Sequence, residues 1–259
     1  MSVVKTSISE RSPLSPTHWP ADAFIWWQSL LFAFALVAII FVSGIPVLIA
    51  MVATGTVNRQ ELTGTHFNWV LFDVSMVSYV LPFAAMLLVV PRLAHRSLAD
   101  LGLRWPRSAD LTWGLTGAIA MFVIANLAGA LETALFHVKP DEAQVHWLHE
   151  MHGALLVALV FLACICAPIF EEFAFRGFIF NALLRYLPLW LAVVLSSALF
   201  GLAHGVGQPG NSGALFPLAA GGAVLALVYY YSRSLTASMI THATFNLFTV
   251  VLVVAFHQS

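Results

Sequence analysis

The chain has 259 residues, of which 60% are hydrophobic and only 9% are charged. Soluble domains carry about 25% charged residues, so this composition excludes an ordinary soluble protein and predicts a polytopic membrane protein. The formal net charge of −1 excludes the strongly basic surface that nucleic-acid-binding proteins use, and we expect no nucleic-acid partner.

The first part of the chain, residues 1–23, is polar and rich in serine and proline. It lacks the charged region followed by an apolar region that defines a cleavable signal peptide. We therefore expect a polar cytoplasmic tail at 1–23, followed by a single transmembrane domain at 24–259.

Seven apolar segments are long enough to cross a membrane, which requires about 20 residues in a helix. They are 24–52, 67–91, 111–136, 152–185, 188–205, 213–231 and 235–256. The predicted fold is an all-α polytopic transmembrane helix bundle of about seven spans, or eight if one segment is divided. Pro46 and Pro168 are the predicted kink points of the first and fourth segments.

The distribution of lysine and arginine predicts the orientation of these spans. With the N-terminus in the cytoplasm, nine of the eleven basic residues fall on the cytoplasmic side, or eight if Arg176 is counted as intramembrane. Only Arg59 and Lys139 fall outside. We predict an integral protein of a bacterial plasma membrane with a cytoplasmic N-terminus, because the chain is short and has no organelle signal.

Ionised side chains interrupt the fourth segment, in the stretch "PIFEEFAFRG" from Pro168 to Gly177. Charges are costly at membrane depth unless they pair or take part in chemistry. Glu172 and Arg176 are spaced i,i+4, which predicts an ion pair between them. Glu171 is rotated by about 100° from Glu172, which leaves its carboxylate for another partner.

Histidines at membrane depth supply such partners. His204 ends the fifth segment in "ALFGLAHG", with Phe200 on the same face, and His242 is spaced i,i+4 from Asn246 in "SMITHATFNLF". Glu171 and His204 each lie ~25 Å from the turn between their segments, so they are at matching levels. His242 is only ~11 Å from its own turn, so the three meet only if the hairpin between the fourth and fifth segments protrudes.

This set of side chains predicts hydrolysis of an amide by water. A carboxylate in an apolar site suits general-base activation of water. Histidine can stabilise an oxyanion, shuttle a proton or bind zinc, and asparagine can polarise a carbonyl group. The sequence leaves metal dependence open; if zinc is bound, the predicted ligands are Glu171, His204 and His242.

Three motifs resemble a known family. "EEFAFRG" matches E-E-x-x-x-R, "FGLAH" matches F-x-x-x-H, and "HATFN" matches H-x-x-x-N. In this order and inside apolar helices, they resemble the CPBP intramembrane proteases, also called the Abi family. That family includes the CAAX prenyl endopeptidase and bacterial bacteriocin-processing or immunity proteins. The motifs extend from Pro168 to Asn246, about a third of the chain, and indicate a catalytic core at about 150–250.

The resemblance implies an intramembrane endopeptidase of the glutamate or metallo type, similar to a CAAX prenyl protease. Glu171 would activate the hydrolytic water with His204 as its partner. His242 and Asn246 would form the oxyanion-binding or water-orienting side of the site. The supporting residues would be Glu172, Arg176 and Phe200.

The resemblance implies a peptide or protein substrate and allows a lipidated C-terminal tail, a leader peptide or a membrane partner. Membrane lipid is the other expected partner. The alternative function is a non-enzymatic immunity or adaptor protein, or a small-solute or proton carrier that uses the same buried ionisable residues. Carriers often contain inverted repeats, and the sequence has no evident symmetry of this kind.

Overall fold

The computed structural model describes three long stretches and several short pieces of the chain. The long stretches are 102–137, 153–205 and 215–256, and the short pieces are 27–28, 31, 35, 49, 52–55, 82–89, 91–92 and 97–99. Within these residues every regular element is helical and no strand occurs, which confirms the all-α class. The predicted tail at 1–23 and Pro46 lie outside the described residues.

The described helices follow the third to seventh predicted segments. They are α3 (Ser108–Phe136), α5 (Gly153–Phe161), η4 (Leu162–Cys166), α6 (Ala167–Glu172), η5 (Phe173–Phe180), α7 (Asn181–Leu184), α8 (Leu189–Gly205), α9 (Leu215–Ser232) and α10 (Leu235–Phe256). Within the described residues, four stretches are long and apolar enough to cross a membrane, namely Ser108–Phe136, Leu156–Leu184, Leu215–Ser232 and Leu235–Ala255. Leu189–His204 is a shorter apolar helix. The segments at 24–52 and 67–91 lie mostly outside the described residues, so the count of seven or eight spans stays a prediction.

The fourth segment is one long helix that contains two π-helical stretches. The elements α5, η4, α6, η5 and α7 follow one another without a break, and η4 and η5 are π-helical. Pro168 is the second residue of α6 and follows the π-turn of η4, where the N–H of Ala167 bonds to the carbonyl of Leu162, five residues earlier. The predicted irregularity at Pro168 is thus a π-turn just before the proline, which has no N–H to continue the ladder.

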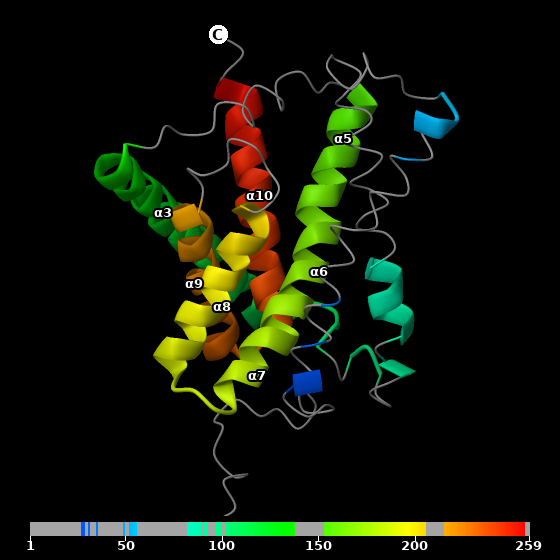
Figure 1. Cartoon of the computed structure of the whole chain (residues 1–259), viewed down its shortest axis with the longest axis vertical. Helices are drawn as coiled ribbons and strands as arrows, with labels where there is room; N and C mark the ends of the chain where they lie inside the picture. The colour runs from blue at the N-terminus through cyan, green and yellow to red at the C-terminus, as the bar shows by residue number, and fades with distance from the viewer. Residues whose placement is uncertain are drawn as a thin grey trace, which may run out of the picture.

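The π-helical part η5 of this long helix is enclosed by its neighbours. All eight residues of η5 are buried, including the charged Arg176 and the fully enclosed Phe173, Phe178 and Phe180. Helix α10 lies between α3 on one side and the α5–α7 helix on the other (Figure 1). Leucine and isoleucine side chains on the outer face of α3 remain exposed, as expected of a helix surrounded by lipid.

Two glycines set the close approach of α3 to α10. A Cβ atom at Gly114 would lie 2.4 Å from Cγ2 of Ile240, and one at Gly117 would lie 2.5 Å from Oγ1 of Thr241. Small residues of this kind allow membrane helices to pack backbone to backbone. The contact fixes the rotation of α10, which carries His242.

Candidate active site

Three ionisable side chains from three helices converge in the bundle. Nε2 of His204, at the end of α8, lies 3.2 Å from Oε2 of Glu171 on α6. Nε2 of His242 on α10 lies 3.9 Å from the same oxygen. Glu171 and His242 are only 5% and 4% exposed, whereas the side chain of His204 is 30% exposed. His204 therefore lies at the accessible edge of the cluster and Glu171 at its interior.

The protruding hairpin accounts for the meeting of these three residues. The turn between α7 and α8 extends beyond the start of α10 along the long axis of the molecule (Figure 1). Tyr186 in that turn is 64% exposed, whereas Leu235 at the start of α10 is 1% exposed. Helix α10 begins deeper in the bundle than the α7–α8 turn. His242, seven residues after Leu235, therefore lies at the same level as Glu171, which is fifteen residues from Tyr186.

The second glutamate is a hydrogen-bonding centre. Oε1 of Glu172 accepts hydrogen bonds from Nη1 of Arg176 at 2.8 Å and from Nδ1 of His242 at 3.1 Å. Oε2 of Glu172 accepts one from the hydroxyl of Ser238 at 2.5 Å. Nη2 of Arg176 donates to the carbonyl of Gly222 at 2.8 Å. The predicted ion pair is therefore present with both partners fully buried, and further polar contacts stabilise it.

These partners determine which nitrogen of each histidine carries a proton. Nδ1 of His204 lies 2.8 Å from the carbonyl oxygen of Phe200, which can only accept, so Nδ1 is the donor. Nδ1 of His242 is likewise the donor to the Glu172 carboxylate. In both imidazoles Nε2 is then the nitrogen directed at Glu171.

The charge balance of the cluster requires one additional proton. Glu171 and Glu172 contribute two negative charges and Arg176 contributes one positive charge. A single proton held between Glu171 and His204 makes the cluster neutral, which a site of low dielectric constant favours. The distance of 3.2 Å between Oε2 of Glu171 and Nε2 of His204 is within reach of a hydrogen bond through that proton.

An aromatic ring separates the guanidinium group from the histidines. Cζ of Arg176 lies 4.6 Å from the ring centroid of Phe200, which is a cation–π contact. The same ring is 4.4 Å from that of His204 and 5.8 Å from that of His242. Phe200 is 1% exposed. It keeps Arg176 directed at Glu172 and limits the movement of both imidazoles.

The amide of Asn246 has a partner outside this cluster. Its Nδ2 atom donates to the carbonyl of Ala163 at 2.7 Å. A π-helical carbonyl normally accepts from the N–H five residues later, which for Ala163 is residue 168. Residue 168 is a proline and has no N–H to donate. Asn246 thus satisfies a carbonyl that Pro168 leaves open, and one of its N–H groups is committed to that role.

Sequence reasoning missed Ser238 and Gly222. Ser238, His242 and Asn246 recur at i, i+4 and i+8 on α10, so one helical face carries all three, and this spacing was a usable signal. No comparable pattern marks Gly222, which contributes its backbone carbonyl. A Cβ atom there would lie 3.2 Å from Cδ1 of Phe200, so glycine also makes room for that ring.

The arrangement does not support the zinc set that the sequence left open. Among the described residues, no group of three or more histidine, cysteine, aspartate or glutamate side chains is placed to hold a metal ion. Nε2 of His204 is instead at hydrogen-bonding distance from Glu171.

Comparisons with known proteins give a consistent family. Residues 153–248 match the Rce1-like family, described as type II CAAX prenyl endopeptidase Rce1-like. YdiL of Bacillus subtilis, named as a membrane peptidase, is 22% identical over 178 residues, which cover 69% of this chain and 70% of YdiL. The membrane-embedded CAAX protease MroQ of Staphylococcus aureus is 22% identical over 201 residues, which cover 74% of this chain and 77% of MroQ.

No solved structure gives a significant match to the chain. The matches to membrane peptidases agree with the apolar helices of the fold and with a peptide or protein as the substrate. The match of residues 153–248 and the two relatives confirm the resemblance of the three motifs to the CPBP proteases, and the apolar helices are those of an integral membrane protein.

Proposed function

We propose that this protein hydrolyses a peptide bond within the membrane by water that Glu171 and His204 activate. The observation that carries the proposal is the 3.2 Å contact between Nε2 of His204 and Oε2 of Glu171, in a largely buried cluster. A carboxylate and an imidazole that share one proton suit the removal of a proton from water and its later delivery. The proposed catalytic core is about 150–250.

In the proposed reaction, a water molecule binds between Glu171 and His242. Glu171 removes one proton, and the resulting hydroxide attacks the scissile carbonyl carbon to form a tetrahedral oxyanion. Nε2 of His242 accepts a hydrogen bond from the water and orients it, because Nδ1 of the same ring already donates to Glu172. The protonated His204 and the remaining N–H of Asn246 donate to the oxyanion.

The cleavage step then returns the proton. Protonated Glu171 delivers it to the leaving nitrogen, the carbon–nitrogen bond breaks, and the products are a carboxylic acid and an amine. Glu172, Arg176, Ser238 and Phe200 hold the histidines in position and do not contact the reacting atoms. The adaptor and carrier alternatives gain no support from relatives whose names describe peptidases.

The proposed substrates are those that the family resemblance allows, a prenylated C-terminal tail or a leader peptide, and the proposed setting is a bacterial plasma membrane with the N-terminus in the cytoplasm. Purified full-length protein would be incubated with a prenylated CAAX peptide, the same peptide without the prenyl group, and a leader peptide. Products would be identified by mass spectrometry.

Wild-type protein should cleave at least one class, and Glu171→Gln and His204→Ala should not. Glu132→Gln is the matched control, because Glu132 is also a buried carboxylate but lies on α3 and accepts from the backbone N–H of Phe216 on α9. Equal activity in Glu171→Gln and wild type would rule out the proposed general base.

A further inference from the structure

A second site lies on the face of α10 that is turned away from the histidines. It is a pocket of about 900 Å³ between α10, the η4–α6 part of the long helix and the segment 97–106. Its wall is almost entirely apolar and includes Leu98, Leu103, Ile165, Ile169, Met239 and Ile240. The volume falls in the range of about 300–1,000 Å³ that small-molecule sites occupy.

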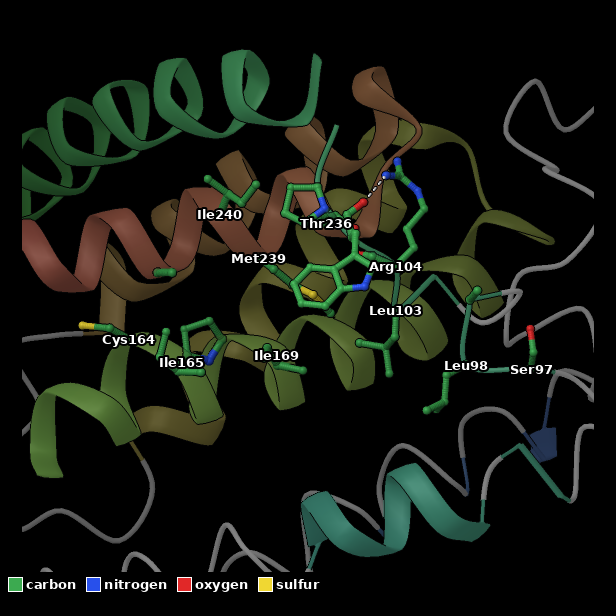
Figure 2. A pocket seen from close by; sticks show the side chains of 15 residues that line it. Ser97, Leu98, Leu103, Arg104, Cys164, Ile165, Ile169, Thr236, Met239 and Ile240 are labelled. Carbon is green, nitrogen blue, oxygen red and sulfur yellow. Dashed lines mark hydrogen bonds between the residues drawn. The ribbon is translucent and has the colours of Figure 1, made fainter. Parts of the chain in front are cut away.

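The pocket has a polar end and an apolar end. Figure 2 shows Ser97, Arg104 and Thr236 at one end of the lining and Cys164 and Ile165 at the other. Thr236 is in the first turn of α10 and Arg104 precedes α3, so the polar end lies where these two helices begin. Cys164 and Ile165 lie well inside a membrane-spanning helix. This polarity matches an amphiphile whose chain points into the bilayer.

A network of hydrogen bonds builds the polar end. Arg104 binds Asp110 through both terminal nitrogens, at 2.7 and 3.1 Å, and also donates to the hydroxyl of Ser234 at 3.1 Å. The backbone N–H of Arg107 donates to Asp110 at 2.8 Å. Arg233 directly precedes Ser234 in the turn between α9 and α10. The network therefore places the backbone of Arg107 and of Arg233 next to the polar end, although neither residue is part of the pocket wall itself.

The charge around this end is positive. Arg104 and Asp110 neutralise each other, whereas Arg107 and Arg233 are exposed and have no carboxylate partner among the described residues. Trp105, at the mouth of the pocket, is 91% exposed, as expected of a side chain that anchors in the headgroup layer. Basic side chains at this level attract anionic lipids.

We propose that this pocket binds an acidic phospholipid, with one acyl chain against α10 and α6 and the phosphate held by Arg107 and Arg233. The apolar wall disfavours a peptide, because it offers almost no partners for backbone N–H and carbonyl groups. The positive charge around the polar end disfavours a zwitterionic lipid. This site is separate from the proposed peptidase chemistry and stands or falls independently of it.

The test is lipid binding by purified full-length protein, measured by native mass spectrometry. Phosphatidylglycerol and phosphatidylcholine with identical acyl chains would be titrated separately, with inorganic phosphate as a third probe. We expect phosphatidylglycerol to bind at least tenfold more tightly than phosphatidylcholine. Inorganic phosphate should not displace it, because the chain supplies much of the affinity. Equal affinity for the two lipids, or displacement by inorganic phosphate, would overturn the proposal.

Two kinds of variant locate the site. Arg107→Gln and Arg233→Gln should each weaken phosphatidylglycerol binding about fivefold and leave phosphatidylcholine binding unchanged. Arg185→Gln is the matched control, because Arg185 is an exposed arginine in the α7–α8 turn and is not adjacent to the Arg104–Asp110–Ser234 network, and it should behave as wild type. Charge variants without effect would place the lipid elsewhere.

The apolar end is tested by Ile165→Trp, at a side chain that is 47% exposed, and by Ala243→Phe, which also lines the pocket. Both should weaken the binding of either lipid. If they abolish peptide cleavage and leave phosphatidylglycerol binding intact, the pocket is a substrate channel and the lipid assignment is wrong.

Discussion

Oε2 of Glu171 lies 3.2 Å from Nε2 of His204, although 33 residues and a hairpin separate the two residues in the chain. The side chain of Glu171 is 7% exposed and that of His204 is 30% exposed, so the pair joins the interior of the cluster to its accessible edge. A proton shared at this contact can be exchanged with a water or a substrate. The first prediction concerns this pair.

Glu171→Gln should lower kcat by about 10²–10⁴-fold, the usual contribution of a general base. Glutamine keeps the size of the side chain and can still bond to His204, so folding should be preserved. The measurement is the rate of peptide cleavage, with thermal unfolding in detergent as the check on folding. A variant that is folded and loses less than tenfold in rate would assign the base to another residue.

Ser238→Ala should destabilise the protein by about 1–3 kcal/mol, because it leaves an oxygen of the buried Glu172 carboxylate without its donor. The matched control is Ser196→Ala. Ser196 is also fully buried, but its hydroxyl has no hydrogen-bond partner among the described residues, so its removal should cost little. The two variants would be compared by chemical or thermal unfolding. Equal losses would mean that the Ser238 hydroxyl does not support Glu172.

Removal of metal ions should leave cleavage within about twofold of the untreated rate, since the proposed reaction has no metal-dependent step. Protein would be dialysed against a strong chelator and assayed at once, and a zinc-dependent peptidase would serve as the positive control for chelation. Loss of activity that added zinc restores would instead support the ligand set of Glu171, His204 and His242.

Gly117→Ala should destabilise the contact between α3 and α10 by about 1–3 kcal/mol, the typical cost of overpacking. The new methyl group would lie 2.5 Å from Oγ1 of Thr241 and 2.7 Å from Cγ2 of Val228. Gly129→Ala is the control on the same helix, because the nearest atom to its new methyl group is 3.8 Å away. That variant should be neutral or more stable by up to about 1 kcal/mol. Similar effects of both changes would show that α3 does not need the small residue at 117.

The sequence was sufficient where local geometry decides the outcome. The i,i+4 rule predicts the pair of Glu172 and Arg176, and equal rise along two antiparallel helices predicts the level match of Glu171 and His204. The same estimate placed His242 at a different level from Glu171, because it assumed that all turns lie at the same depth in the membrane. The π-turns were not foreseen, since they depend on packing around Pro168 and η5. Ser238 and Gly222 depend on the rotation of neighbouring helices, which a sequence alone does not give.

The last prediction is a coupling between Pro168 and Asn246. Asn246→Leu should destabilise the protein by about 1–3 kcal/mol, because the part-buried carbonyl of Ala163 loses its donor. Pro168→Ala supplies a backbone N–H that can satisfy this region of the helix. In the Pro168→Ala background, Asn246→Leu should therefore cost less than in wild type.

A double-mutant cycle measured by unfolding gives this difference directly, and we expect a coupling of about 0.5–3 kcal/mol, as for residues that share a partner. Thr249→Val is a control for loss of a side-chain donor on the same helix, because Thr249 bonds only to the carbonyl of Phe245 among the described residues. It should be additive with Pro168→Ala. Additivity of Asn246→Leu as well would mean that Asn246 does not replace the missing N–H of the proline. Its contact with Ala163 would then be incidental to the stability of the long helix.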